Sequence, residues 1–235
     1  ELKERRFDEK QDYVFLSLNV IPHQKIEIDV QGAQVPLSLL KPIWEAEVFE
    51  EWGLTEGKAK IINYMREKGY LFSSVKFFIE RVDNTMRVVY QVTPGDKLKI
   101  EDISFEGLSY FTPAQLKSEL GIGEKVAFLS WVSGARLFEL PSEIEMLYKT
   151  KGFSQTKVDL NFARRRKSVK ALFYINEGIQ EKTDKISFEG AQLASPQTLR
   201  EQISSFEGGP FFNPDIQKDI ERLENFYLNQ GVRGT

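Results

Sequence analysis

The sequence predicts an α+β protein: a tandem array of β-α-α-β-β repeats, each with a three-stranded sheet and two helices on one face. One observation behind this prediction is the segment Ile-Ser-Phe-Glu-Gly, which occupies residues 103–107 and recurs unchanged at 186–190. A second is that other features keep the same spacing, since Gly69 is repeated as Gly152. Several features on one offset indicate duplication and therefore an array of similar units.

The first two elements of the unit are a strand and a short helix. Apolar and polar residues alternate in 103–107, which is the period of a strand with one buried face. Residues 112–115 are Thr-Pro-Ala-Gln, an order that predicts Thr at the helix N-cap, Pro at the first helical position and Gln returning a bond to the cap. Gly121 is expected to end this helix. Residues 195–196, Ser-Pro, are expected to open the equivalent helix of the next copy.

A second, longer helix follows in each unit. In the last copy Asn213 is expected to cap it, apolar residues recur at helical spacing through 216–227, and Gly231 is expected to close it. In the middle copy Pro141 interrupts the corresponding stretch. Because an interior proline removes a main-chain donor, we expect that helix either to kink or to begin at Ser142.

Two alternating runs complete the unit as a hairpin. In residues 75–79 Val, Phe and Ile occupy alternate positions, residues 83–84 favour a turn, and apolar alternation returns in 88–92. The middle copy repeats this pattern at 158–162 and 171–175.

These patterns divide the chain into four segments. Residues 1–24 are expected to be the last two strands of a preceding repeat, 25–97 and 98–180 two whole repeats, and 181–235 a truncated repeat. The repeat at 25–97 is the least regular, because isolated prolines stand where the other copies have the Ser/Thr-Pro cap. We expect residues beyond Thr235 to complete the last repeat, since a unit without its last two strands depends on its neighbour for stability.

Composition argues against an enzyme. The 235 residues carry a net charge of −3, no cysteine and one histidine, His23. The absence of cysteine excludes disulfides and thiolate-bound metals, and a single histidine nearly excludes a Ser-His-Asp triad or a paired-histidine metal site. We therefore predict no catalytic residues, no metal and no cofactor. The slightly acidic balance gives no bulk electrostatic reason to bind nucleic acid, and no apolar stretch approaches the roughly 20 residues of a membrane-spanning helix.

Three short motifs, repeated in order along the chain, resemble POTRA (polypeptide-transport-associated) repeats. They are the Ile-x-Phe-x-Gly strand, an aromatic residue four positions before the glycine that ends the second helix, and Pro-Gly or Glu-Gly between units. They fall at residues 103–107, Tyr148 to Phe153, Tyr227 to Gly231, Pro94–Gly95 and Glu177–Gly178. The resemblance covers essentially the whole chain, although Met65 stands at the tyrosine position of the repeat at 25–97.

The resemblance implies the periplasmic segment of an outer-membrane protein assembly factor of the BamA kind in a Gram-negative bacterium. It implies docking of unfolded outer-membrane proteins and of accessory periplasmic lipoproteins. It also implies a C-terminal membrane barrel, outside this sequence, as the only contact with the membrane. An organelle outer envelope is the alternative location.

Two alternative functions stay open. One is the POTRA arm of a translocation or secretion barrel. The other, from a different class, is a KH-like RNA-binding repeat, which also has a glycine loop between two helices. The loops at 121–123 and 208–209 lack the GXXG clamp of such modules, and Glu124 and Glu207 beside them disfavour phosphate binding.

The predicted binding site is the edge of each sheet. An extended client can add a strand to a sheet edge by main-chain hydrogen bonding, and a penultimate strand that pairs only with its hairpin partner offers such an edge. Phe78 is expected to point away from the helix-covered face, where it contacts either a client side chain or a neighbouring repeat. The predicted client- or partner-binding residues are Val75, Lys76, Phe77, Phe78, Ile79, Glu80, Val158, Asp159, Leu160, Asn161 and Phe162.

One charge run stands out. Arg164, Arg165, Arg166 and Lys167 lie between the two alternating runs of the middle copy, which predicts a hairpin tip. The simpler interpretation is a solvated loop, and the sharper one is contact with an anionic surface.

Tryptophans gather in the helical parts of the sequence. Trp44, Val48 and Trp52 are spaced four residues apart, which predicts a core stripe or a contact between repeats. Trp131 also falls in a helical part.

Overall fold

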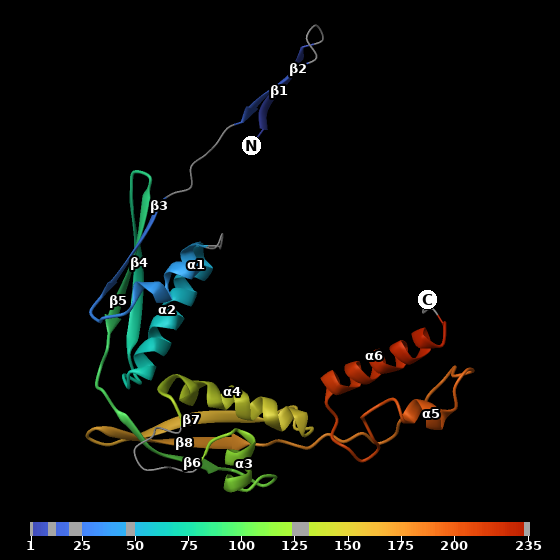
Figure 1. The fold of residues 1–235 in the computed structure, drawn as a ribbon. Helices are drawn as coiled ribbons and strands as arrows, with labels where there is room; N and C mark the ends of the chain where they lie inside the picture. The colour runs from blue at the N-terminus through green and yellow to red at the C-terminus, as the bar shows by residue number, and fades with distance from the viewer. Residues whose placement is uncertain (1, 9–12, 19–24, 46–49, 124–131, 233–235) are drawn as a thin grey trace. The chain divides into compact units, whose positions relative to one another are not determined.

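The computed structural model of the chain describes residues 2–8, 13–18, 25–45, 50–123 and 132–232. The chain divides into two compact parts, which are residues 1–65 with 72–95, and residues 66–71 with 96–235. Each part has its own sheet and helices (Figure 1).

The first part contains the N-terminal hairpin and the first repeat. Its elements are β1 (Leu2–Asp8), β2 (Tyr13–Leu18), β3 (Lys25–Gln31), the 3-10 turn η1 (Leu37–Leu39), α1 (Lys41–Glu45), α2 (Glu50–Glu67, whose last two residues belong to the second part), β4 (Ser74–Val82) and β5 (Thr85–Thr93). β1 and β2 form an antiparallel pair, which agrees with the two strands that the sequence predicts in residues 1–24. The other three strands form a sheet of order β3-β5-β4, in which central β5 is parallel to β3 and antiparallel to β4.

Two glycines of α2 admit aromatic rings, Gly53 the ring of Trp44 from α1 and Gly57 the ring of Tyr90 from the sheet. A Cβ on Gly53 would lie 3.2 Å from the Trp44 ring, and one on Gly57 would lie 2.1 Å from the Tyr90 hydroxyl oxygen. Tyr90 is fully buried, and burial raises its pKa to about 12, so the hydroxyl keeps its proton and donates to the Gly53 carbonyl at 3.3 Å. The glycines weaken helix propensity but bring helix and sheet together.

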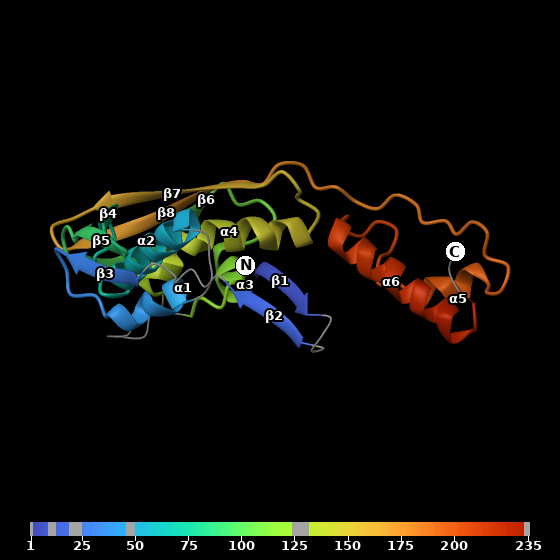
Figure 2. The same ribbon diagram turned by 90° about the horizontal axis from the view of Figure 1, so that it is seen from above.

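The second part repeats the same topology. Its elements are β6 (Lys99–Glu106), α3 (Pro113–Glu119), α4 (Gly134–Thr150), β7 (Lys157–Arg164), β8 (Ser168–Asn176), α5 (Pro196–Arg200) and α6 (Asn213–Asn229). The sheet order is β6-β8-β7, again with the last strand central, and α4 lies along the sheet in both views (Figures 1 and 2). Its core includes Leu137, Leu140, Ile144, Tyr148 and Phe173, none of which is exposed.

Two predicted helix starts are confirmed. Thr112 caps α3 by accepting from the Gln115 amide at 3.2 Å, and the Gln115 side chain accepts from the Thr112 amide at 2.9 Å. Ser195 caps α5 by accepting from the Thr198 amide at 3.1 Å.

Two other helix starts differ from the prediction. Helix α4 begins at Gly134 and continues through Pro141, so the start at Ser142 is wrong. Burial of the apolar face on both sides of the proline offsets the lost main-chain bond. Asn213 is the first residue of α6 and not its N-cap, because the Phe212 carbonyl accepts the first helical bond, from the Asp215 amide at 3.0 Å.

The predicted first strand of the last copy is not formed. Residues 186–190 have no strand assignment, and among the described residues only Lys182 bridges to Pro210 nearby. In the whole repeats the first strand pairs in parallel with the last strand of its own unit. In the described part of the chain the last copy contains no such strand, so the repeated motif alone cannot form a ladder.

The predicted core stripe is wrong at Trp52, which is 51% exposed. The alternative, a contact between repeats, stays a prediction. Trp44 is half-buried against α2. Val48 and Trp131 lie outside the described residues.

A glycine turn ends each second helix and receives the chain of the next unit. Gly69 and Gly152 have φ of +90° and +88°, which favours glycine. Their carbonyls accept from the Leu98 and Glu181 amides at 2.9 and 2.8 Å, both within the second part. A Cβ on Gly152 would lie 2.4 Å from the Glu181 carbonyl oxygen.

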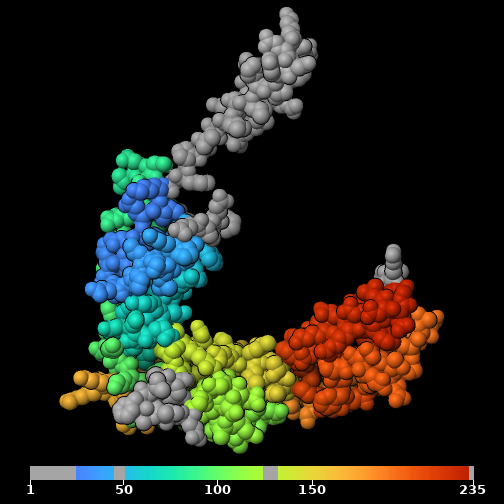
Figure 3. All heavy atoms as spheres, viewed as in Figure 1, coloured from blue at the N-terminus to red at the C-terminus, as the bar shows by residue number. Residues whose placement is uncertain are grey.

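The last copy is held together by a buried carboxylate. Asp219 of α6 is 4% exposed and accepts from the Ser204 and Ser205 amides at 2.8 and 2.9 Å, and from Arg222 at 2.6 Å. Burial alone would raise the pKa of Asp219, but hydrogen bonds from Ser205 and Ser204 outweigh it and hold the pKa well below its ordinary value. In Figure 3 the α5 and α6 segments, orange and red, adjoin.

We expect Gly57→Ala to destabilise the chain, although alanine normally favours a helix. The new methyl group collides with the Tyr90 hydroxyl, so the free energy of unfolding should fall by about 1–3 kcal/mol. Chemical denaturation followed by circular dichroism measures this. Adding Tyr90→Phe should restore part of the loss, and a Gly57→Ala protein more stable than the parent would contradict the packing.

We expect Asp219→Asn to loosen the last copy in a pH-dependent way. The folded pKa lies below the unfolded value of about 3.9, so the stabilisation is present above that pH and is lost as the pH falls below it. At pH 7 the variant should weaken local stability by about 1–3 kcal/mol, measured by hydrogen exchange of the Ser204 and Ser205 amides. The difference should shrink on acidification. Glu221→Gln, which changes an exposed carboxylate of α6, is the control. Equal protection at pH 7 would refute the role of Asp219.

Candidate functional site

The penultimate strand of each whole repeat lies at a sheet edge. Among the described strands, β4 pairs only with β5, in continuous register from Ser74↔Thr93 to Val82↔Thr85. β7 likewise pairs only with β8, from Lys157↔Asn176 to Arg164↔Val169. The expected geometry of the two predicted edge strands is therefore present, whereas their binding role stays a prediction.

The predicted site residues alternate between two faces of these strands. In β4 Val75 is buried, Ile79 is half-buried and Phe77 is 38% exposed, on the face that meets the helix. On the opposite face Phe78 is 42% exposed and lies across from Val89. The exposed neighbours on that face are Lys76 and Glu80.

β7 follows the same alternation. Val158 is buried and Leu160 and Phe162 are half-buried on the helix-covered face, whereas Asp159 and Asn161 are exposed on the other. Phe162 also packs on Phe138 of α4, with ring centroids 5.5 Å apart. The side chains that face the helix are therefore part of the core, and only the open-face residues are fully accessible.

One hydrogen bond fixes the direction of the main chain in β7. The Val158 amide donates to Glu145 Oε1 of α4 at 3.1 Å, so it points away from β8. Main-chain groups alternate in direction along an antiparallel strand, and the register of β7 is unbroken, so Leu160 and Phe162 also direct their amides outward.

The same direction applies to β4. It has the same neighbouring strand, the same antiparallel pairing and the same helix-covered face as β7, and the chirality of L-residues then places its outward amides at the equivalent positions. These are Val75, Phe77 and Ile79. The amide of Phe78 points toward β5 instead, so Phe78 can contribute its side chain but not its main chain to an added strand.

The open face of the first sheet carries charged residues next to apolar ones. Arg87 on β5 lies 3.0 Å from Asp29 on β3 and 3.5 Å from Glu80 on β4. Phe78 and buried Val89 lie in the next row of the sheet. Phe78 therefore provides an aromatic contact within a charged surface.

The basic run is a hairpin tip, as predicted. Arg164 ends β7 and forms an ion pair with Asp96, and Arg165 lies 3.4 Å from Glu101. All four residues, Arg164, Arg165, Arg166 and Lys167, are exposed. Two of them have carboxylate partners at the start of β6, so the tip has a structural role whether or not it meets an anionic surface.

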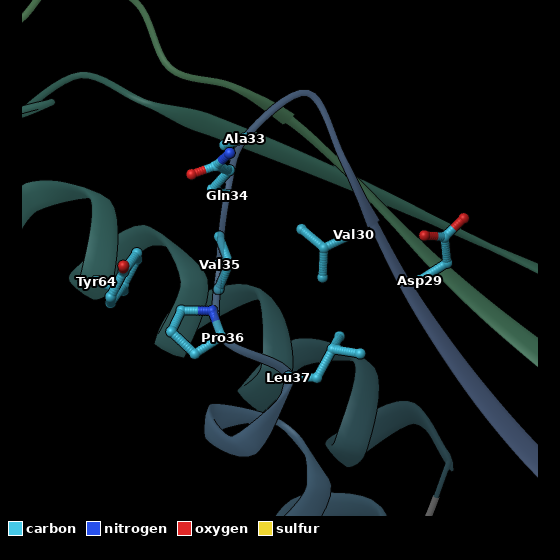
Figure 4. A pocket seen from close by; sticks show the side chains of 8 residues that line it. All are labelled: Asp29, Val30, Ala33, Gln34, Val35, Pro36, Leu37 and Tyr64. Atoms are coloured by element: carbon cyan, nitrogen blue, oxygen red, sulfur yellow. The ribbon is translucent and has the colours of Figure 1, made fainter.

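The first repeat also has a pocket of about 540 Å³ (Figure 4). It lies between the end of β3, the chain that follows it and Tyr64 of α2. Its lining is mostly small and apolar: Asp29, Val30, Ala33, Gln34, Val35, Pro36, Leu37 and Tyr64.

Larger side chains occupy the corresponding place in the second repeat. Tyr110 and Phe111 stand where the first repeat has Val35 and Pro36, and their rings lie 5.1 Å from Phe153 and 5.2 Å from Tyr148 respectively. Two of the residues that line the pocket are therefore smaller than their equivalents in the second repeat.

A buried carboxylate supports the cluster in the second repeat. Glu177 accepts from the Ser109 and Tyr110 amides at 2.8 and 2.9 Å and from the Tyr148 hydroxyl at 2.7 Å. Burial, together with the hydrogen bond to Glu177 and its negative charge, raises the pKa of Tyr148 far above its ordinary value. Pro94 stands at the equivalent position of the first repeat and cannot make these bonds.

The sequence does not single out Glu145 or Glu177, although each makes defined hydrogen bonds in the structure. Glu145 lies in a charged helical stretch, and Glu177 appears only as part of a Glu-Gly pair. Aligning the copies could have pointed to Glu145, because Ile62 occupies its place in the first repeat. Within the described ranges, no helix has the length and apolarity to cross a membrane.

Comparison with known proteins places this geometry in a family. Residues 98–178 and 182–234 match the POTRA model, described as a surface antigen variable number repeat. The outer membrane protein assembly factor BamA of Nitratidesulfovibrio vulgaris (strain Hildenborough) is 24% identical over 195 residues, which covers 76% of this chain and 24% of that protein. The chain thus spans about a quarter of the curated relative that it matches.

A solved structure shows the same fold. POTRA domains 3–5 of BamA from Haemophilus influenzae align with a TM-score of 0.58 at 16% identity, covering 88% of this chain and 89% of that one. The structure has the predicted α+β architecture, and the family model covers more than half of the 235 residues. The chain therefore belongs to the POTRA family.

Proposed function

We propose that this chain is a periplasmic segment of an outer-membrane protein assembly factor in a Gram-negative bacterium. It would dock unfolded outer-membrane proteins and accessory periplasmic lipoproteins ahead of a C-terminal membrane barrel. Membership of the POTRA family and the similarity to a BamA protein support this proposal. Family membership leaves no support for the KH-like alternative.

The observation that carries the proposal is the pair of edge strands. β4 and β7 direct main-chain groups away from their sheets, and an extended segment of an unfolded protein can bond to such groups with little regard to its sequence. Alternating side chains of the added strand would then lie over the helix or over the open face, where Phe78 can contact them. Docking of this kind needs no catalytic group, so we propose a scaffold and not an enzyme.

The proposal predicts that Phe77→Pro weakens binding of an extended peptide. Proline removes an outward amide without removing a bond to β5, and edge strands tolerate it. The probe is a fluorescent ten-residue peptide with alternating apolar and polar residues, the pattern of a membrane β-strand. Its dissociation constant, measured by anisotropy, should rise by about fivefold, the factor that a lost bond of about 1 kcal/mol gives.

Phe77→Ala is the matched control, because it removes the same side chain and keeps the amide. Its affinity should stay above that of Phe77→Pro, and circular dichroism checks that both variants fold. A folded Phe77→Pro protein that binds the peptide as well as Phe77→Ala does would overturn strand addition at β4.

A further inference from the structure

The two edge strands differ in one contact. In β7 the first outward amide, that of Val158, is already bonded to Glu145 Oε1 at 3.1 Å. Glu145 is held there by α4, since its neighbours Ile144 and Tyr148 are fully buried in the core of the second part. The carboxylate is therefore fixed against the strand edge by the packing of its own helix.

This contact opposes an added strand. An incoming strand bonds to an outward amide through its own carbonyl oxygen, which would have to occupy the place of the carboxylate oxygen. Both groups are acceptors, and the partial negative charge of the carbonyl oxygen faces the full negative charge of the carboxylate. They therefore repel each other unless the carboxylate leaves. Inward-pointing charges are one of the ways in which natural sheets keep their edges from pairing.

The first repeat lacks this carboxylate. With the helix-ending glycines Gly69 and Gly152 aligned, the position of Glu145 is occupied by Ile62 in α2. The side chain of Ile62 has no acceptor for the Val75 amide. In α6, aligned on Gly231, the position holds Glu224, so isoleucine is the exception among the three copies.

We propose that Glu145 closes the edge of β7 to strand addition, and that Ile62 leaves β4 open, so that an extended client binds the first repeat in preference to the second. This inference rests on the proposed function, because it concerns which edge takes the client. Glu145 acts as a specificity residue, because it accepts the hydrogen bond of the Val158 amide to which a client would bind.

The chain contains no cysteine, so single cysteines can report on each edge separately. Lys76→Cys and Asp159→Cys place a thiol at equivalent, exposed positions on the open faces of β4 and β7. The probe is the ten-residue alternating peptide with one cysteine, and the readout is the yield of disulfide cross-linked product at equilibrium in a thiol redox buffer. We expect cross-linking at position 76 and little at position 159.

Opening the closed edge is the decisive step. Glu145→Ala should raise the yield at position 159 by about tenfold while leaving position 76 unchanged, since a charged acceptor no longer competes for the amide. Glu145→Gln keeps an uncharged acceptor and should give a smaller rise. The reciprocal change, Ile62→Glu, should lower the yield at position 76, with circular dichroism confirming that each variant is folded.

The outcomes separate this inference from the proposed function. Two outcomes would overturn the role of Glu145 and leave strand addition standing. One is an equal cross-linking yield at positions 76 and 159 of the parent chain. The other is an unchanged yield at position 159 in Glu145→Ala while position 76 still cross-links. No cross-linking above a scrambled-pattern peptide at either position, in any variant, would overturn strand addition itself.

Discussion

In both whole repeats the last strand lies between the other two, and the rest of the unit depends on this arrangement. β5 and β8 each pair in parallel with the first strand and antiparallel with the second. The first strand therefore depends on the last strand of its own unit for its ladder bonds. Residues 186–190 repeat the motif of β6 and have no strand assignment. The same arrangement places β4 and β7 at sheet edges, where an added strand can bind.

Interiors differ more between copies than topology does. Tyr110, Phe111, Tyr148 and Glu177 form a dense polar-aromatic cluster in the second repeat, whereas smaller residues leave a pocket at the same place in the first. The first repeat compensates on its other side, where Gly57 admits the Tyr90 ring to the surface of α2. One backbone topology thus accommodates two different sets of core side chains.

Edges that look alike by topology can differ in availability. The Val158 amide is bonded to a helix carboxylate, and the equivalent helix position in the first repeat is Ile62. An unpaired sheet edge is also a site for aggregation, so a protein gains from protecting the edges that it does not use. The two edges therefore differ by one side chain on the covering helix.

The sequence by itself determined the repeat, the order of its elements, the capped starts of α3 and α5 and the family, because these depend on local periodicity, cap chemistry and internal comparison. Tertiary structure decided the rest. Continuation of α4 through Pro141 depends on the burial of its apolar face. Trp52 is exposed although helical spacing assigns it to a core stripe, because periodicity does not show which face of a helix is covered. Residues 186–190 have no strand assignment, because a first strand of this repeat depends on its pairing with the last strand. The contact between Glu145 and Val158 joins a helix to an edge strand across a turn, and only the packing of α4 on its sheet sets which carboxylate reaches that amide.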